Sequence, residues 1–211
     1  MKSLEREIAE KLLQIKAVNL QPTHPFTWAS GWKSPIYCDN RKTTSYPEFR
    51  SLIKNAFARL IPEHFPETTA IAGVATGGIA QGALLADVLG LPFVYVRSAP
   101  KGHGLENLIE GDLNLGSKVA IIEDLISTGS SSLKAVQAVR NHGCEVTGML
   151  AVFTYGFPVA EQQFKAAGVQ LITLSNYDAV IEEALQINFI SKGDIAVLKA
   201  WRLNPAHFYE K

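Results

Sequence analysis

Two adjacent acids followed by a run of hydroxyl residues form the part of this sequence best suited to chemistry. Glu123 and Asp124 come directly after four apolar residues, Val119–Ile122, which predict a short buried strand. A turn of small residues, Ser127–Ser131, comes next, and a helical pattern begins behind it. Backbone N–H groups at a helix N-terminus are unsatisfied, and the helix dipole favours an anion there. The turn therefore predicts a phosphate cradle.

The two acids predict a second part of the same ligand. Carboxylates repel phosphate, whereas neighbouring sugar hydroxyls suit them because hydrogen bonds to a carboxylate are strong. Gly129 lets the backbone approach a ligand closely. The implied ligand is a ribose 5-phosphate unit. The alternative is that Ser127–Ser131 only caps a helix, but buried strands seldom end in two acids without a partner.

The stretch Val119–Ser131 resembles the phosphoribosyl-diphosphate signature of the type I phosphoribosyltransferases. In that signature an apolar strand, two acids and two mostly apolar residues precede Thr-Gly among small residues. The resemblance implies that phosphoribosyl diphosphate, the donor of the ribose, binds here and that Asp124 is also catalytic. The implied donor contacts are Glu123, Asp124, Leu125, Ile126, Ser127, Thr128, Gly129, Ser130 and Ser131.

An aromatic segment near the N-terminus, Phe26–Arg41, could wrap a planar ligand. A short hairpin whose aromatic side chains cover a sheet is the alternative. The segment is similar to the N-terminal hood of the orotate phosphoribosyltransferases, with Phe-Thr, Ser-Gly, Ser-Pro and Asp-Asn-Arg in the expected order. Some members carry a lysine where this chain has Ala29. Either Lys33 or Arg41 then compensates, or the donor site is less cationic.

A second strand, glycine loop and helix run from Thr69 through Gly77 and Gly78 to Leu89. The loop can again present backbone amides to an anion, and it is not a dinucleotide-binding fingerprint. The family resemblance implies a pyrophosphate loop made by Thr76, Gly77 and Gly78. Some members have a lysine at the position of Gly77.

A long polar segment, about residues 97–116, follows a third predicted strand, Phe93–Val96. Loops of this length in compact domains often act as lids, although a solvated surface loop is the alternative. The resemblance implies a catalytic lid in which Arg97, Lys101 and His103 bind and neutralise the pyrophosphate. In the family this lid closes from the neighbouring subunit, which implies a homodimer.

Recognition of the base is the least defined part of the site. Some family members hold the carboxylate of the base with an arginine in the loop that corresponds to Thr154–Pro158, and this chain has none there. We expect Ser127, Tyr37 and Tyr155 to contact the base.

The elements that position these residues alternate between strand and helix, which predicts an α/β fold with a parallel sheet. Each marked loop follows a predicted strand, so all of them should lie at one edge of the sheet. The expected architecture is a type I phosphoribosyltransferase core, with helices on both faces and a small N-terminal hood at about residues 20–45. The remaining elements are predicted at 4–18, from Pro47 to near Pro62, at 145–153, at 169–174 and in two helical stretches to about Leu203.

Length and composition fit one domain, or one domain with a modest hood, over residues 1–211. The resemblance implies that this is a single phosphoribosyltransferase domain. Twenty basic and twenty acidic residues give no net charge, which favours neither nucleic acid nor membrane as a partner. Cys38 and Cys144 have no metal-type spacing, and the N-terminus is charged rather than a signal peptide. We therefore expect a cytoplasmic protein.

The resemblance implies transfer of ribose 5-phosphate to orotate, which gives orotidine 5′-monophosphate and pyrophosphate in the biosynthesis of UMP. Mg²⁺ is the implied cofactor, held mainly through the substrate rather than by protein ligands. Two alternatives remain. A sister enzyme would act on a purine or on uracil, and the hood segment argues against it. A non-enzymatic regulator would bind nucleic acid, which the balanced charge does not favour.

Overall fold

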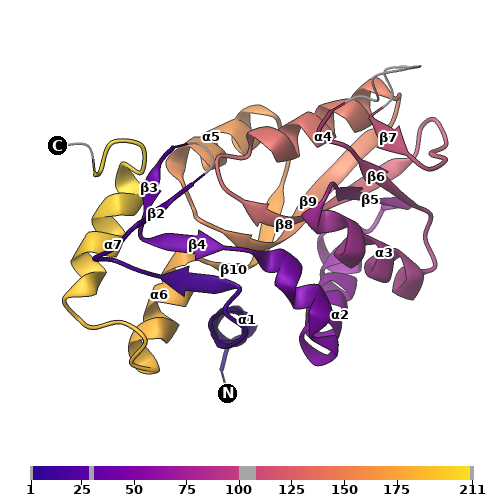
Figure 1. Cartoon of the computed structure of the whole chain (residues 1–211). Helices are drawn as coiled ribbons and strands as arrows, with labels where there is room; N and C mark the ends of the chain where they lie inside the picture. The colour runs from indigo at the N-terminus through magenta and orange to yellow at the C-terminus, as the bar shows by residue number, and fades with distance from the viewer. Residues whose placement is uncertain (1, 29–30, 100–107, 210–211) are drawn as a thin grey trace.

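The computed structural model describes residues 2–28, 31–99 and 108–209. A six-stranded sheet forms its centre (Figure 1). The strand order is β10 (Leu171–Asn176), β9 (Glu145–Thr154), β8 (Lys118–Ile126), β5 (Ala70–Val74), β6 (Phe93–Val96) and β7 (Ile109–Glu110). Neighbouring strands are parallel except at the β6–β7 edge. The predicted α/β fold with a parallel sheet is confirmed.

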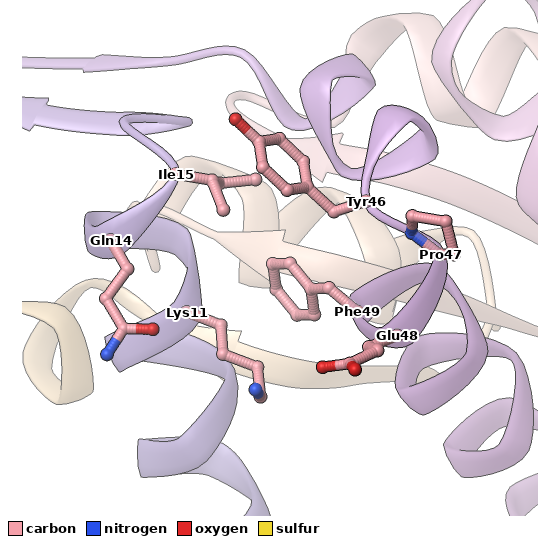
Figure 2. Close-up of a pocket in the computed structure, with 7 residues that line it drawn as sticks. All are labelled: Lys11, Gln14, Ile15, Tyr46, Pro47, Glu48 and Phe49. Carbon is pink, nitrogen blue, oxygen red and sulfur yellow. The ribbon is translucent and has the colours of Figure 1, made fainter.

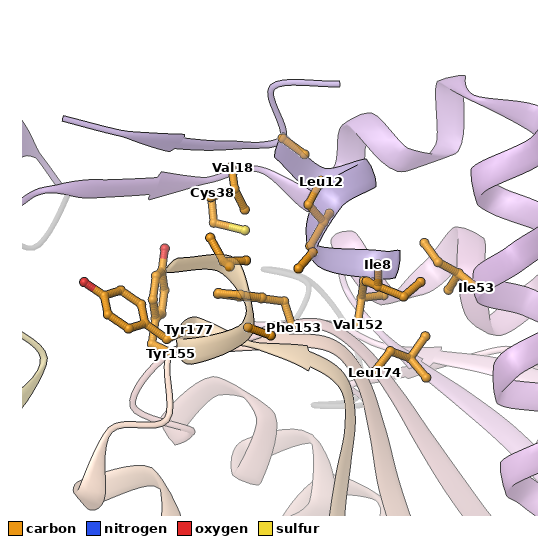
Figure 3. Packing of buried hydrophobic residues seen from close by; sticks show 14 of the residues in the cluster. Ile8, Leu12, Val18, Cys38, Ile53, Val152, Phe153, Tyr155, Leu174 and Tyr177 are labelled. Atoms are coloured by element: carbon orange, nitrogen blue, oxygen red, sulfur yellow. The ribbon is translucent and has the colours of Figure 1, made fainter. Parts of the chain in front are cut away.

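Helices cover both faces of the sheet, because alternate residues of each strand point to opposite sides. On β8, Ala120 and Ile122 pack with helices α1 (Leu4–Gln14), α2 (Pro47–His64) and α6 (Tyr177–Gln186). Figure 3 shows this core, with Ile8 and Leu12 of α1 above Val152 and Leu174 of the sheet. Val119 and Ile121 face α4 (Ser130–Asn141) and α5 (Pro158–Ala166) instead.

Two helix ends differ from the sequence-based expectation. Helix α1 ends at Gln14 rather than at residue 18, because Lys16 has a φ of 53° and turns the chain into β1 (Val18–Leu20). Helix α2 passes Pro62 and ends at His64. The N–H of Phe65 still donates to the carbonyl of Ile61 at 2.8 Å, so the last turn closes around the proline.

The hood is built from two small antiparallel ladders and a short 3₁₀ helix. Strand β1 pairs with β4 (Ile36–Cys38), and β2 (Phe26–Thr27) pairs with β3 (Lys33–Ser34). The 3₁₀ helix η1 (Asn40–Ser45) leads from β4 into α2.

The C-terminal helix α7 (Asp194–Leu203) holds the hood in place. Trp201 of α7 is fully buried, and its indole Nε1 donates to the carbonyl of Lys33 at 3.0 Å. Its ring meets that of Trp28 edge-on at 5.7 Å. Figure 1 shows α7 beside the β2–β3 hairpin. Helix α7 and the hood therefore pack together although they are far apart in the sequence.

An ion-pair cluster attaches α1 to α6. The carboxylate of Glu183 accepts hydrogen bonds from Lys2 at 2.5 Å and from Arg6 at 3.0 Å. The Glu183 side chain is only 2% exposed. Within the three described ranges, no helix is both long and apolar enough to cross a membrane.

Candidate active site

The predicted loops meet at one edge of the sheet. Strands β9, β8, β5 and β6 are consecutive neighbours and run in the same direction, so their carboxyl ends lie side by side. Helix α3 (Gly77–Leu89) follows β5 and covers one face, whereas α4 follows β8 and covers the other. The β5–β8 boundary is therefore a topological switch point, where open α/β sheets form their ligand crevices.

The two acids lie inside a strand rather than after it. Strand β8 continues to Ile126, because Leu125 and Ile126 pair with Phe153 and Thr154 of β9. Adjacent residues in a strand point to opposite faces, yet the carboxylates of these two acids remain close enough to interact with each other. Glu123 is 5% exposed and turns toward α4, where it accepts from Ser132 Oγ at 3.0 Å. Asp124 turns toward α3 and the hood.

Burial raises the pKa of both acids. The pKa of Glu123 lies well above its usual range because the group is desolvated and because the charge of Asp124 is close. Burial likewise raises the pKa of Asp124, and the neighbouring carboxylate of Asp39 adds to the effect. The site thus concentrates negative charge that the described side chains only partly compensate, which is an arrangement suited to binding positive charge.

The hydroxyl-rich turn forms the N-terminus of α4, as the sequence predicts. Gly129 is the N-cap residue and has a φ of 85°, a conformation that favours glycine. No side chain caps this end of the helix. The amides of the first turn are therefore open to an anion, with the hydroxyls of Thr128 and Ser130 3.4 Å apart beside them.

The glycine loop lies directly beside Asp124. The peptide bond between Ala75 and Thr76 is cis, and α3 begins at Gly77. A Cβ atom at Gly77 would lie 2.1 Å from Cγ of Asp124, and one at Gly78 would lie 2.2 Å from the carbonyl oxygen of Ile122. At Gly78 the conflict is with backbone, so glycine is required there, whereas at Gly77 the conflict is with the side chain of Asp124, which can move. A larger side chain at position 77 would displace the carboxylate of Asp124.

The predicted lid is only partly within the described structure. Arg97 donates to Glu110 at 3.2 Å, and its backbone N–H donates to the carbonyl of Leu108. Ile109 and Glu110 form the short edge strand β7, which pairs with β6, within the segment predicted as the lid. Lys101 and His103 lie outside the described residues.

A cavity of about 340 Å³ lies between the hood and the sheet edge. Tyr37, Ser127 and Tyr155, the three residues predicted to contact the base, all line it. Tyr155 is 2% exposed and lies parallel to the Phe157 ring at 5.4 Å. Burial raises the pKa of the Tyr155 hydroxyl well above its usual range, so this group stays protonated at neutral pH. The remaining lining residues are Thr27, Trp28, Cys38 and Leu125.

Sequence reasoning missed several residues of this region. Cys38 and Asn40 were not singled out, although both lie in the stretch that resembles the family hood. Asn40 is 1% exposed, and its Nδ2 donates to the backbone carbonyl of Asp124 at 2.6 Å. The Asp-Asn-Arg motif was the available signal, but a sequence does not show which buried carbonyl an asparagine meets.

Another cavity, of about 440 Å³, lies between α1 and α2 (Figure 2). Lys11 and Gln14 of α1 line it together with Ile15, which follows that helix, opposite Tyr46 and Phe49. None of the predicted site residues lies in it. Among the described residues, no group of three or more His, Cys, Asp and Glu side chains could hold a metal ion.

Comparison with known proteins agrees with this geometry. The phosphoribosyl transferase domain family matches residues 44–188. The orotate phosphoribosyltransferase of Bacteroides fragilis is 66% identical over 208 residues, which covers 99% of this chain and 98% of that protein. The Porphyromonas gingivalis orotate phosphoribosyltransferase is 65% identical and covers 97% of this chain and 98% of its own length.

Structural similarity extends to a more distant relative. The crystal structure of orotate phosphoribosyltransferase from Aeropyrum pernix has a TM-score of 0.76 at 28% identity, over 87% of this chain and 99% of that one. Both the sequence and the fold match along nearly the whole length of these proteins. The chain therefore belongs to the orotate phosphoribosyltransferase family, within the phosphoribosyl transferase domain family.

Proposed function

We propose that this chain transfers the ribose 5-phosphate of phosphoribosyl diphosphate to orotate at the edge of the sheet, releasing pyrophosphate. One observation carries the proposal: Ser127 both begins the turn that leads into α4 and lines the cavity under the hood. A phosphate at the turn and a planar base in the cavity would then share one ribose. That ribose would lie beside Asp124.

In the reaction, the bond from ribose C1 to the pyrophosphate oxygen breaks and its electron pair leaves with the pyrophosphate. The pyrimidine nitrogen forms the new bond to C1 and loses its proton. Positive charge develops on the ribose, so positioning and electrostatics supply most of the catalysis. Asp124 is better placed than Glu123 to meet a ribose hydroxyl, because the carboxylate of Glu123 already accepts from Ser132 and from the Asp124 amide.

The donor would be held by the residues that the family resemblance implies. The amides and hydroxyls of Ser127–Ser131 would bind the 5′-phosphate, and Thr76, Gly77 and Gly78 would bind the pyrophosphate. Arg97, Lys101 and His103 would neutralise the leaving group when the lid, about residues 97–116, closes across a homodimer interface. The whole chain would then act as a single cytoplasmic phosphoribosyltransferase domain.

Mg²⁺ fits this site as the cofactor. Burial raises the pKa of both acids, and the charge of Asp124 raises that of Glu123 further, which supports a cation beside Asp124. Oxygen donors with few protein ligands suit Mg²⁺ when it is held mainly by substrate oxygens. When bound, the ion would supply positive charge to the pyrophosphate as it leaves.

Lys33 is the best-placed cation for the carboxylate of orotate. The residues that line the cavity carry no positive charge, and loop 154–158 has no arginine. The ammonium of Lys33 lies 2.7 Å from the hydroxyl of Thr27, which lines the cavity. No carboxylate in the described part of the chain pairs with Lys33.

The test is to follow the ultraviolet absorbance of orotate after phosphoribosyl diphosphate and Mg²⁺ are added. We expect a decrease that depends on both the donor and the ion. Uracil, adenine and hypoxanthine are assayed in parallel for release of pyrophosphate. A folded protein that leaves orotate unchanged but consumes another base would overturn the proposal.

A further inference from the structure

A buried asparagine connects the hood to the acid at the end of β8. Asn40, on η1, uses both ends of its side-chain amide. Its Nδ2 donates to the backbone carbonyl of Asp124 at 2.6 Å, and its Oδ1 accepts from Sγ of Cys38 at 3.2 Å. A carbonyl can only accept, so these partners fix the orientation of the amide.

The same short helix is attached to the glycine-loop side of the site. The hydroxyl of Thr43 donates to the carbonyl of Asn40 at 2.7 Å and accepts from Nε2 of Gln81, on α3, at 3.3 Å. Thr43 and Gln81 are each 1% exposed. Hydrogen bonds in a region this well buried are costly to break, because water cannot replace the lost partner. Helix η1 is therefore fixed to both strand β8 and helix α3.

Strand pairing alone does not fix the backbone of Asp124 on this side. The ladder between β5 and β8 ends at the Gly73–Ile122 pair. Beyond it, β8 pairs only with β9 through Ile126. Asn40 supplies a hydrogen-bond partner for Asp124 where β5 no longer does.

We propose that Asn40 is a positioning residue that holds Asp124 against the glycine loop and links it to the base cavity through Cys38. The proposal rests on the function proposed above, since it assigns Asp124 to the ribose. Cys38 lines the cavity, so a bound base contacts one end of this hydrogen-bond chain while Asp124 lies at the other.

The first test compares Asn40→Ala with Ser34→Ala. Ser34 is a matched control because it is a fully buried hood residue whose hydroxyl donates to the carbonyl of Ile36 at 2.7 Å. We expect Asn40→Ala to lower kcat about ten- to hundredfold, because the buried backbone carbonyl of Asp124 loses its hydrogen-bond donor. The KM for orotate should stay within about threefold of the wild-type value. Ser34→Ala should lower the melting temperature similarly but leave kcat within about twofold.

The second test uses Asn40→Asp, which keeps the size of the side chain. An ionised carboxyl group cannot donate to the Asp124 carbonyl, whereas a protonated one can. The activity of Asn40→Asp relative to the wild type should therefore rise as pH falls from 8 toward 5. Thermal unfolding over the same pH range separates this effect from destabilisation by a buried charge, since a merely structural role would lower stability and activity together.

The outcomes separate the two proposals. If the wild-type protein shows no turnover of orotate, the proposed function fails. If the wild type is active but Asn40→Ala and Ser34→Ala lower kcat equally, Asn40 is structural and the positioning proposal is wrong. A flat pH dependence of the Asn40→Asp to wild-type activity ratio would also overturn it, including when Asn40→Ala does not fold.

Discussion

The backbone of Gly77 packs against the carboxylate of Asp124. A Cβ atom at position 77 would lie 2.1 Å from Cγ and 2.3 Å from both carboxylate oxygens of that acid. The contact joins the first turn of α3 to the end of β8 across the switch point of the sheet. The glycine loop and the acid consequently form one surface, and the position of each depends on the other.

Gly77→Ala should therefore impair turnover more than folding. The added methyl group meets the end of a side chain that can rotate away, so the backbone has no need to rearrange. We expect a melting temperature within a few degrees of the wild type and a kcat lowered at least about tenfold, because small displacements of a catalytic group are costly. Steady-state kinetics and thermal unfolding measure the two effects.

Gly193→Ala is the matched control for this substitution. Gly193 has φ and ψ angles of −66° and −28°, which alanine adopts freely, and its Cβ would meet only Ser191 Oγ, at 3.6 Å. This variant should retain wild-type turnover. Equal kinetics for the two alanine variants would mean that the position of Asp124 does not limit the reaction.

Asp124→Asn should make the protein more stable and less active. Burial raises the pKa of Asp124, so the ionised form opposes folding and this cost grows as pH rises through the folded-state pKa. At pH 8 we expect the variant to melt roughly 2–4 °C higher, as for a gain of about 1 kcal/mol in a chain of this size. The difference should shrink at pH 4, where the wild-type acid is largely protonated.

Turnover in Asp124→Asn should fall at least about a hundredfold, as for loss of a charged group that faces developing positive charge. A trade of stability for activity is typical of strained or charged functional sites. Thermal unfolding from pH 4 to pH 8, with kinetics at pH 8, checks both effects. A variant that is less stable at pH 8 would contradict the assignment of Asp124 as an unfavourably buried charge.

The sheet and the placement of the loops were predictable because they depend on local patterns. Apolar runs such as Phe93–Val96 and Val119–Ile122 specify buried parallel strands, and the ligand loops then fall at their carboxyl ends. Strand β8 was underestimated because Glu123 and Asp124 break its apolar run. Pairing of Glu123, Leu125 and Ile126 with β9 keeps both acids in the strand, and tertiary contact of this kind has no signature in the local sequence.

The contacts between distant segments could not be predicted from the sequence. Trp201 fixes the hood through the carbonyl of Lys33, which is 168 residues away in the chain. Asn40 reaches Asp124 over 84 residues. Neither side chain has a periodicity or motif that names its partner, so the gathering of Tyr37, Ser127 and Tyr155 around one cavity was expected only from family resemblance.

Lys33→Met should weaken binding of orotate more than binding of the donor. Loss of a charge-assisted hydrogen bond to the carboxylate of the base should raise the KM for orotate about tenfold or more. The KM for phosphoribosyl diphosphate should change less than about twofold. Lys42→Met is the control, because the ammonium of Lys42 bonds to the carbonyl of Lys16 rather than lying beside the cavity. Parallel increases in both KM values would assign Lys33 to the donor instead.

Lys101→Ala should reduce kcat by at least about a hundredfold, because the leaving pyrophosphate loses a neutralising charge. Binding of the donor in the absence of orotate should change much less, because the proposed lid would act only when it is closed. Isothermal titration with phosphoribosyl diphosphate and steady-state kinetics separate these steps. The control is Lys192→Ala, at an exposed lysine between α6 and α7. Near-normal turnover in Lys101→Ala would remove this residue from the mechanism.

The cluster around Glu183 should control stability in acid rather than activity. Burial by itself raises the pKa of Glu183, but hydrogen bonds from Lys2 and Arg6 outweigh burial and lower the pKa overall. A lowered pKa means that the ionised acid stabilises the fold above the unfolded-state pKa of about 4.3, and that this contribution is lost as pH falls through the lower folded-state value.

Glu183→Gln should therefore reduce the free energy of unfolding by about 1–3 kcal/mol at pH 7, since two cations lose their buried partner. The difference from the wild type should be constant down to about pH 5 and should shrink below about pH 4, where the wild-type acid also becomes neutral. Urea unfolding at pH 7, 5, 4 and 3 measures this difference.

Glu10→Gln is the matched control, because Glu10 also pairs with Lys2, at 2.9 Å, but is 32% exposed. The control should lose less than about 1 kcal/mol, as for a surface ion pair. A Glu183→Gln deficit that widens as the pH falls would reverse the sign of the linkage and show that the buried carboxylate opposes the docking of α1 on α6.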